Sequence, residues 1–185
     1  MDKIVYEGQW LNCLMSPNGW EYVSRKPFAT YKDGNTKPDA VVIVPMKIGQ
    51  FGENELVMIK EYRSPIGDFT YGFPAGLIDH DETAEEAAIR ELKEETGLTV
   101  KNVFGITPPI FSSEGLTDEC VSIVYVTVEG EVSTKFQEEN EDIKTLVLNE
   151  TGVQKLLSNP DLKFSKIAWM AATVFANTGS LDSLS

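Results

Sequence analysis

The chain has 185 residues, of which 42% are hydrophobic, and a formal net charge of −13. This length suits one domain with a sizeable core and a small appendage, and no segment is long and apolar enough to span a bilayer. The acidic balance argues against binding to nucleic acids or anionic membranes, because both need a basic surface.

Residues 1–36 are expected to form an N-terminal β-hairpin arm. Segments 6–16 and 19–27 are typical of short strands, and the Asn-Gly pair in the turn at 16–19 favours a tight hairpin. A two-stranded ribbon is only marginally stable alone. The arm therefore needs to pack on its own domain or on a second subunit, and we expect it to form a dimer.

Residues 37–185 are expected to form a single domain of strands and helices. Apolar, β-branched runs favour strands, and prolines mark the breaks between them. The predicted strands are 39–46, 55–64, 98–106, 120–131 and 145–149, with an extended segment at 70–76 and loops at 110–119 and 135–144.

Two helices are predicted to close the chain, over about 151–158 and 165–177. The tail at 178–185 is polar and is expected to fray. Strands with one helix embedded among them, and helices again at the end, fit an α/β fold with mixed β-sheets sandwiched between α-helices.

The single histidine and the two cysteines carry no site. Cys13 and Cys120 belong to no CxxC or Cys/His cluster, so we expect reduced thiols in a cytoplasmic protein. The first ten residues have neither the basic nor the apolar region of an export signal, which agrees with a cytoplasmic location. We expect His80 in an exposed loop.

A well-marked helix is predicted after the extended segment. Thr83 and Glu86 have the spacing of a capping box, so the helix should begin at about Ala84. Gly97 can adopt the left-handed conformation that ends a helix. The sequence therefore predicts a helix over about 84–96.

Acidic residues lie on the face that this helix should bury. Glu91 and Glu95 fall in the middle of a face of alanines and Glu94 lies on its flank, at 100° per residue. Buried carboxylates need a positive partner, and a hard divalent cation takes oxygen ligands. The pattern indicates a metal site; the alternative is a solvated acidic helix.

The segment at 76–98 resembles the Nudix box without a departure. The matching positions are Gly76, Glu82, Arg90, Glu91, Leu92, Glu94, Glu95, Gly97 and Leu98. The resemblance implies the Nudix α/β/α fold and a hydrolase of nucleoside diphosphates linked to another group. It also implies Mg²⁺ or Mn²⁺ held by Glu91, Glu94, Glu95 and the backbone carbonyl of Ala75, with Glu82 and Arg90 as an orienting ion pair.

Segments outside the box resemble the ADP-ribose pyrophosphatase branch of this family. They are FPAGLID (73–79), EYRSP (61–65), the tryptophans of the arm, and ENEDI (139–143). The resemblance implies that Trp10 and Trp20 sandwich the adenine across a homodimer interface, that Arg25 and Arg63 bind the substrate, and that Glu141 is the catalytic base. The implied reaction converts ADP-ribose to AMP and ribose 5-phosphate.

Alternatives remain open for the substrate and for single residues. Glu114 stands where many relatives have a proline associated with ADP-ribose preference, which leaves GDP- or UDP-sugars, nucleoside triphosphates or capped RNA as substrates. A non-catalytic nucleotide sensor is a third class. The two tryptophans could instead stiffen the hairpin by cross-strand packing, Arg25 could form an interface ion pair, and Arg63 could be a surface charge.

Overall fold

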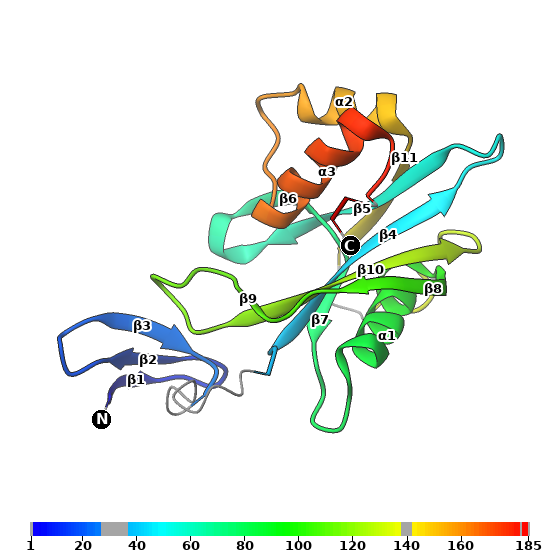
Figure 1. Cartoon of the computed structure of the whole chain (residues 1–185). Coiled ribbons are helices and arrows are strands. Elements are labelled where there is room, and N and C mark those ends of the chain that lie inside the picture. Colours follow the sequence, from blue (N-terminus) through cyan, green and yellow to red (C-terminus); the bar gives the residue numbers. More distant parts are fainter. Residues whose placement is uncertain (1, 27–36, 138–141, 182, 185) are drawn as a thin grey trace.

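A mixed β-sheet between two layers of helix forms the body of the protein (Figure 1). The computed structural model describes residues 2–26, 37–137, 142–181 and 183–184. Helix α1 covers one face of the sheet and helices α2 and α3 cover the other, while a small separate sheet lies at the N-terminal side (Figure 1). The predicted α/β sandwich is confirmed.

The large sheet has eight strands, and its central path runs β11-β5-β4-β10-β8. Strands β4 and β10 pair in parallel, and the other pairs are antiparallel. The short strands β6, β7 and β9 pair with β5, β4 and β10, respectively. The bounds are β4 Ala40–Ile48, β5 Asn54–Arg63, β6 Asp68–Gly72, β7 Ala75–Leu77, β8 Thr99–Ile106, β9 Ile110–Phe111, β10 Cys120–Glu129 and β11 Ile143–Leu148.

The helices lie where the sequence predicts them, within one residue. They are α1 (Ala84–Thr96), α2 (Glu150–Leu157) and α3 (Lys166–Thr178), with a short 3-10 helix at Ser64–Ile66. None of the helices in the described ranges combines the length and the apolar character needed to cross a bilayer.

Strand β4 is buried on both faces and joins the two halves of the core. Val41 and Ile43 pack in the cluster that contains the alanines of α1, whereas Val44 and Met46 pack in the cluster around Phe175 of α3. Alternate side chains of a strand point to opposite faces, so a continuous apolar run is what a strand between two helical layers requires.

The N-terminal arm has three strands, so the prediction of two was wrong. Its sheet runs β1 (Lys3–Glu7), β2 (Asn12–Met15) and β3 (Glu21–Ser24). The first predicted strand is broken where Gly8 N–H donates to Leu11 O at 3.0 Å, so the chain turns back on itself there. The predicted turn at 16–19 is confirmed, with Gly19 at φ 84° and its N–H bonded to Ser16 O.

Two further predictions differ from the structure. Part of the predicted loop at 110–119 forms β9, because Ile110 and Phe111 pair with the start of β10. The tail does not fray at Leu181, which is fully buried in the cluster around Phe175. Its apolar side chain fills space beside α3, and burial of a leucine outweighs the loss of chain entropy there. Cys13 and Cys120 are both free thiols, as predicted.

Candidate active site

The capping box at the start of α1 fixes where the helix begins. Thr83 Oγ1 accepts from Glu86 N–H at 3.2 Å, and Glu86 Oε2 accepts from Thr83 N–H at 2.9 Å. Gly97 ends the helix at φ 75°, and its N–H donates to Lys93 O. With both ends set, the alanine face lies on the sheet and carries the acids of the following turns with it.

Three glutamates of α1 lie at one site, with graded burial. Glu95 is only 4% exposed, and the side chains of Glu91 and Glu94 are 14% and 43% exposed. The N–H of Ala75 donates to Glu95 Oε1 at 3.3 Å, so strand β7 lies directly against the acids. Of the three predicted acidic ligands, the structure therefore brings Glu95 to Ala75, and it places the carboxylate of Glu91 against the next residue, Gly76.

Arg90 is the positive partner at this site. Its Nη1 donates to Glu91 Oε1 at 2.7 Å and to Glu94 Oε2 at 3.2 Å, and its Nε and Nη2 both reach Glu82 at 2.9 Å. The predicted Glu82–Arg90 pair is confirmed. Hydrogen bonds from Arg90 hold the pKa of Glu82 below its usual range, and those to Glu82 raise the pKa of Arg90.

Gly76 leaves room for the carboxylate of Glu91. A Cβ added at this glycine would lie 1.9 Å from both Cδ and Oε1 of Glu91, far inside van der Waals contact. Only a residue without a side chain fits between β7 and this carboxylate. The structure therefore explains Gly76, the first glycine of the 76–98 motif, by the close approach of the Glu91 carboxylate and not by a positive φ angle.

The donor atoms suit a hard divalent cation. Within the part of the chain that the structure describes, no three His, Cys, Asp or Glu side chains are close enough together to hold a metal, because Glu91 and Glu94 turn toward Arg90. The chemistry nonetheless fits: carboxylate and carbonyl oxygens are the ligands of Mg²⁺ and Mn²⁺, and the Gly76 cradle seats one carboxylate beside the buried Glu95.

A cavity of about 400 Å³ reaches Ala75, although none of the acids of α1 lines it. Ala75, which bonds Glu95, lines it, and so does Arg63 at the end of β5. Arg63 Nη2 pairs with Glu61 Oε2 at 2.8 Å. Arg63 therefore lines the same cavity as Ala75, but its side chain is 53% exposed, so the alternative of a surface charge stays open.

The arm packs on its own domain through the loop between β9 and β10. Trp20 Nε1 donates to Gly115 O at 3.2 Å, and Val23 N–H donates to Leu116 O at 2.9 Å. Arg25 Nε pairs with Glu119 Oε1 at 3.1 Å. The arm was expected to pack on its own domain or on a second subunit. These contacts show that it packs on its own domain.

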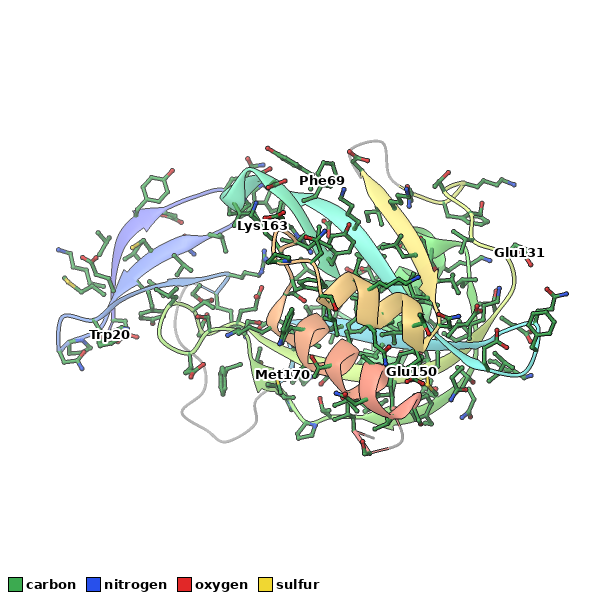
Figure 2. All side chains as sticks on the ribbon, turned by 90° about the horizontal axis from the view of Figure 1, so that it is seen from above. Trp20, Phe69, Glu131, Glu150, Lys163 and Met170 are labelled. Carbon is green, nitrogen blue, oxygen red and sulfur yellow. The ribbon has the colours of Figure 1, made fainter. Side chains whose placement is uncertain are left out.

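The two tryptophans of the arm remain exposed. Trp20 is 59% and Trp10 is 75% exposed, and Figure 2 shows Trp20 at the far tip of the arm. No ring contact joins the two among the described residues, which disfavours mutual cross-strand packing. Trp20 lines a second hollow together with Glu114 and Asp118. Burial raises the pKa of Asp118 although Ser24 donates a hydrogen bond to it.

One predicted site residue is not described by the structure, and one group of cavity residues was not predicted. Glu141, the predicted catalytic base, lies outside the described residues. The C-terminal helix was assigned no role from sequence, yet Ser165, Lys166, Ile167 and Met170 of α3 and its cap line the cavity. No motif marks these positions, so the sequence offers no signal that could have found them.

Comparison with known proteins identifies relatives along most of the chain. A family model described as NUDIX domain matches residues 36–169. "Putative nudix hydrolase 2" of Caenorhabditis elegans is 32% identical over 177 residues, which is 86% of this chain and 75% of the worm protein. "ADP-sugar pyrophosphatase" of Mus musculus is 31% identical over 138 residues, 70% of this chain and 61% of the mouse protein.

Two further matches agree with these. "ADP-ribose pyrophosphatase" of Bacillus subtilis is 30% identical over 134 residues, 71% of this chain and 69% of the bacterial protein. A crystal structure described as an ADP compounds hydrolase superposes with a TM-score of 0.62 at 21% identity, covering 96% of this chain and 90% of that one. At this identity the structural match supports the fold alone.

Proposed function

The chain belongs to the Nudix hydrolase family, and from this membership we propose that it hydrolyses the pyrophosphate bond of a nucleoside diphosphate sugar, with ADP-ribose giving AMP and ribose 5-phosphate. The observation that carries the proposal is the acidic face of α1, where Glu95 accepts from Ala75 N–H and Glu91 lies against Gly76, beside a cavity that Arg63 and Ala75 line. The names of the mouse and Bacillus relatives, an ADP-sugar pyrophosphatase and an ADP-ribose pyrophosphatase, support this substrate class.

The proposed reaction is attack of water on one phosphorus and departure of the other phosphate. Glu91, Glu94, Glu95 and the carbonyl of Ala75 would hold Mg²⁺ or Mn²⁺, which neutralises phosphate charge and lowers the pKa of a bound water. Arg63 presents a planar fork that binds phosphate oxygens in pairs. Glu141 is proposed to accept the proton of the water.

Arg90 has a positioning role in this proposal. It holds Glu91 and Glu94 through one nitrogen and Glu82 through two others. Such a clamp fixes the rotamers of carboxylates that repel one another at helical spacing. The acids are thereby kept at the buried end of the site until a cation shares their charge.

The acidic hollow beside Trp20 favours a second candidate within the same chemistry. Glu114 lines this hollow, and a carboxylate near a stacked base selects among bases by the donors that they offer. Nucleoside diphosphate sugars with other bases, such as GDP- or UDP-sugars, are therefore the alternative. A non-catalytic sensor is less well supported, because Glu91, Glu94 and Glu95 are all retained.

A substrate panel tests the proposal. Phosphate release would be measured with a coupled phosphatase, in Mg²⁺ and again in excess chelator, on ADP-ribose, ADP-glucose, GDP-mannose, UDP-glucose and a nucleoside triphosphate. We expect the fastest turnover with ADP-ribose and its loss in chelator, because the acids alone cannot neutralise a diphosphate. If none of the nucleoside diphosphate sugars were hydrolysed in Mg²⁺ or Mn²⁺, the proposal would be wrong.

We also propose that the arm, residues 1–36, completes the base site in a cytoplasmic homodimer, with residues 37–185 as the catalytic domain. Exposed Trp10 and Trp20 support this, since one tryptophan from each subunit can enclose a base. Arg25, which pairs with Glu119, follows β3 on the same arm.

Replacing Trp20 by alanine should raise KM about tenfold and change kcat less, because base stacking contributes roughly 1–3 kcal/mol. Trp169→Ala on α3 is the matched control, since Trp169 is also exposed but lines neither the cavity nor the hollow. Steady-state kinetics with light scattering give the readout. If KM of Trp20→Ala equalled that of the wild type, the stacking role of Trp20 would be wrong. If light scattering gave a monomer mass for the wild type, the proposed homodimer would be wrong.

A further inference from the structure

We infer that Lys166, on the first turn of α3, binds a phosphate group of the substrate from a wall of the cavity different from the one that carries Arg63. The inference rests on the proposed function, because it takes the ligand of the cavity to be a phosphate ester. It assigns a substrate-positioning role to the C-terminal helix, a part of the chain that the Nudix motif does not include.

The cavity is mostly apolar and contains few charges. Its apolar lining includes Val42, Phe73, Phe111, Val121, Ile167 and Met170. The charged lining residues are Glu61, Arg63 and Lys166, and Glu61 pairs with Arg63. Lys166 therefore contributes a positive charge that the other lining residues do not balance.

The contacts of Lys166 leave it able to take a ligand. Its Nζ donates to the neutral carbonyl of Ser112 at 2.7 Å, and an ammonium has three donors. Within the described part of the chain, no carboxylate forms an ion pair with it. Lys163, three residues earlier, differs on each count: it pairs with Asp68 and does not line the cavity.

Figure 2 shows how these side chains are arranged. Met170, one turn after Lys166, lies on α3, whereas Lys163 lies on the segment before the helix and near Phe69. The helix is anchored by its cap, because Ser165 Oγ accepts from Ala168 N–H at 3.2 Å, and by Ala168, Ala172 and Phe175, all fully buried. The backbone that carries the ammonium is therefore fixed.

A phosphate explains this placement better than a neutral sugar group. Ala75 lines the same cavity and donates to Glu95, so a diphosphate at the acids lies beside the cavity. The chain carries a net charge of −13, which repels phosphate esters. A lysine in partly apolar surroundings offsets that repulsion locally and makes charge-assisted hydrogen bonds, which are stronger than neutral ones.

The test compares Lys166→Gln with Lys166→Arg. Glutamine keeps a donor for the carbonyl of Ser112 but removes the charge, whereas arginine keeps both. If Lys166 binds phosphate, the glutamine variant should raise KM for ADP-ribose about tenfold with a smaller change in kcat, and the arginine variant should stay close to wild type. Lys163→Gln is the control and should be unchanged.

A binding measurement gives a second readout. Calorimetric titration with AMP and with ribose 5-phosphate, in Mg²⁺, should show about tenfold weaker binding of at least one product to Lys166→Gln, and the product affected identifies the phosphate that Lys166 contacts. Lys166 is exposed, so thermal unfolding should stay unchanged in all three variants.

Failure of this inference and failure of the proposed function would give different results. Wild-type kinetics and product affinities for Lys166→Gln would overturn the inference and leave Lys166 as a tether for the loop at Ser112. A wild-type protein that hydrolyses none of the nucleoside diphosphate sugars would overturn the proposed function instead, whatever the variants do.

Discussion

Replacing Glu95 by glutamine should lower kcat for ADP-ribose by at least about a thousandfold, because it removes a charged ligand from the metal that neutralises the diphosphate. Glu95 is the most buried acid of α1 and is bonded by the N–H of Ala75. Glutamine has the same shape and keeps an acceptor for that N–H, so the fold should persist. Steady-state kinetics with circular dichroism give the readout.

The matched control for this variant lies on the same helix. Glu85→Gln removes one negative charge from an exposed position in the first turn of α1, and Glu85 does not line the cavity that contains Ala75 and Arg63. Its kinetics should be those of the wild type. If Glu95→Gln also turned over ADP-ribose normally, the assignment of the acidic cluster as the metal site would be wrong.

Replacing Gly76 by alanine is expected to reduce kcat by about a hundredfold with little loss of stability, because a misplaced catalytic group costs rate without costing packing. The new Cβ would lie 1.9 Å from the carboxylate of Glu91. That carboxylate is the far end of a flexible side chain, so it can swing away while β7 stays in place. The structure thus predicts a folded protein whose Glu91 is displaced.

Gly115→Ala is the comparison for this variant, because a Cβ there meets nothing within 4 Å. Kinetics and thermal unfolding of both variants separate the two effects. Wild-type activity in Gly76→Ala would show that the position of Glu91 does not limit the reaction. If kcat fell together with a marked drop in the unfolding temperature, the substitution would have displaced β7 and not only the carboxylate of Glu91.

Local signals account for the parts of the fold that the sequence predicted well. The cap of α1 depends on Thr83 and Glu86, which are three residues apart, so the residue types and their spacing are enough to predict it. The burial of Leu181 was missed because it depends on tertiary packing. The break at Gly8 is a local turn closed on Leu11, and the glycine that marks it was not used as a turn signal. A leucine in a polar tail gives no sign that α3 has left space for it.

The candidate site divides in the same way. The acids, Gly76 and the Glu82–Arg90 pair lie in one short segment, so their spacing revealed them. The second clamp of Arg90, on Glu91 and Glu94, was not predicted, because periodicity gives the face of a side chain and not its partner. The cavity was missed because its walls come from β5, β7, β9 and α3, which are separated along the chain.

The parallel pairing of β4 with β10 has a consequence for synthesis of the chain. Ala40 pairs with Val121 and Lys47 with Val128, so the edge of β4 that faces β10 stays unpaired while the whole segment that carries the acids is being made, although β5 and β7 can already pair with its other edge. Long-range pairing of this kind is slow to form. An apolar strand with one open edge is prone to aggregate before its partner is made, and the last wall of the cavity emerges only with α3. A nascent chain therefore gains no help from its ligand in folding.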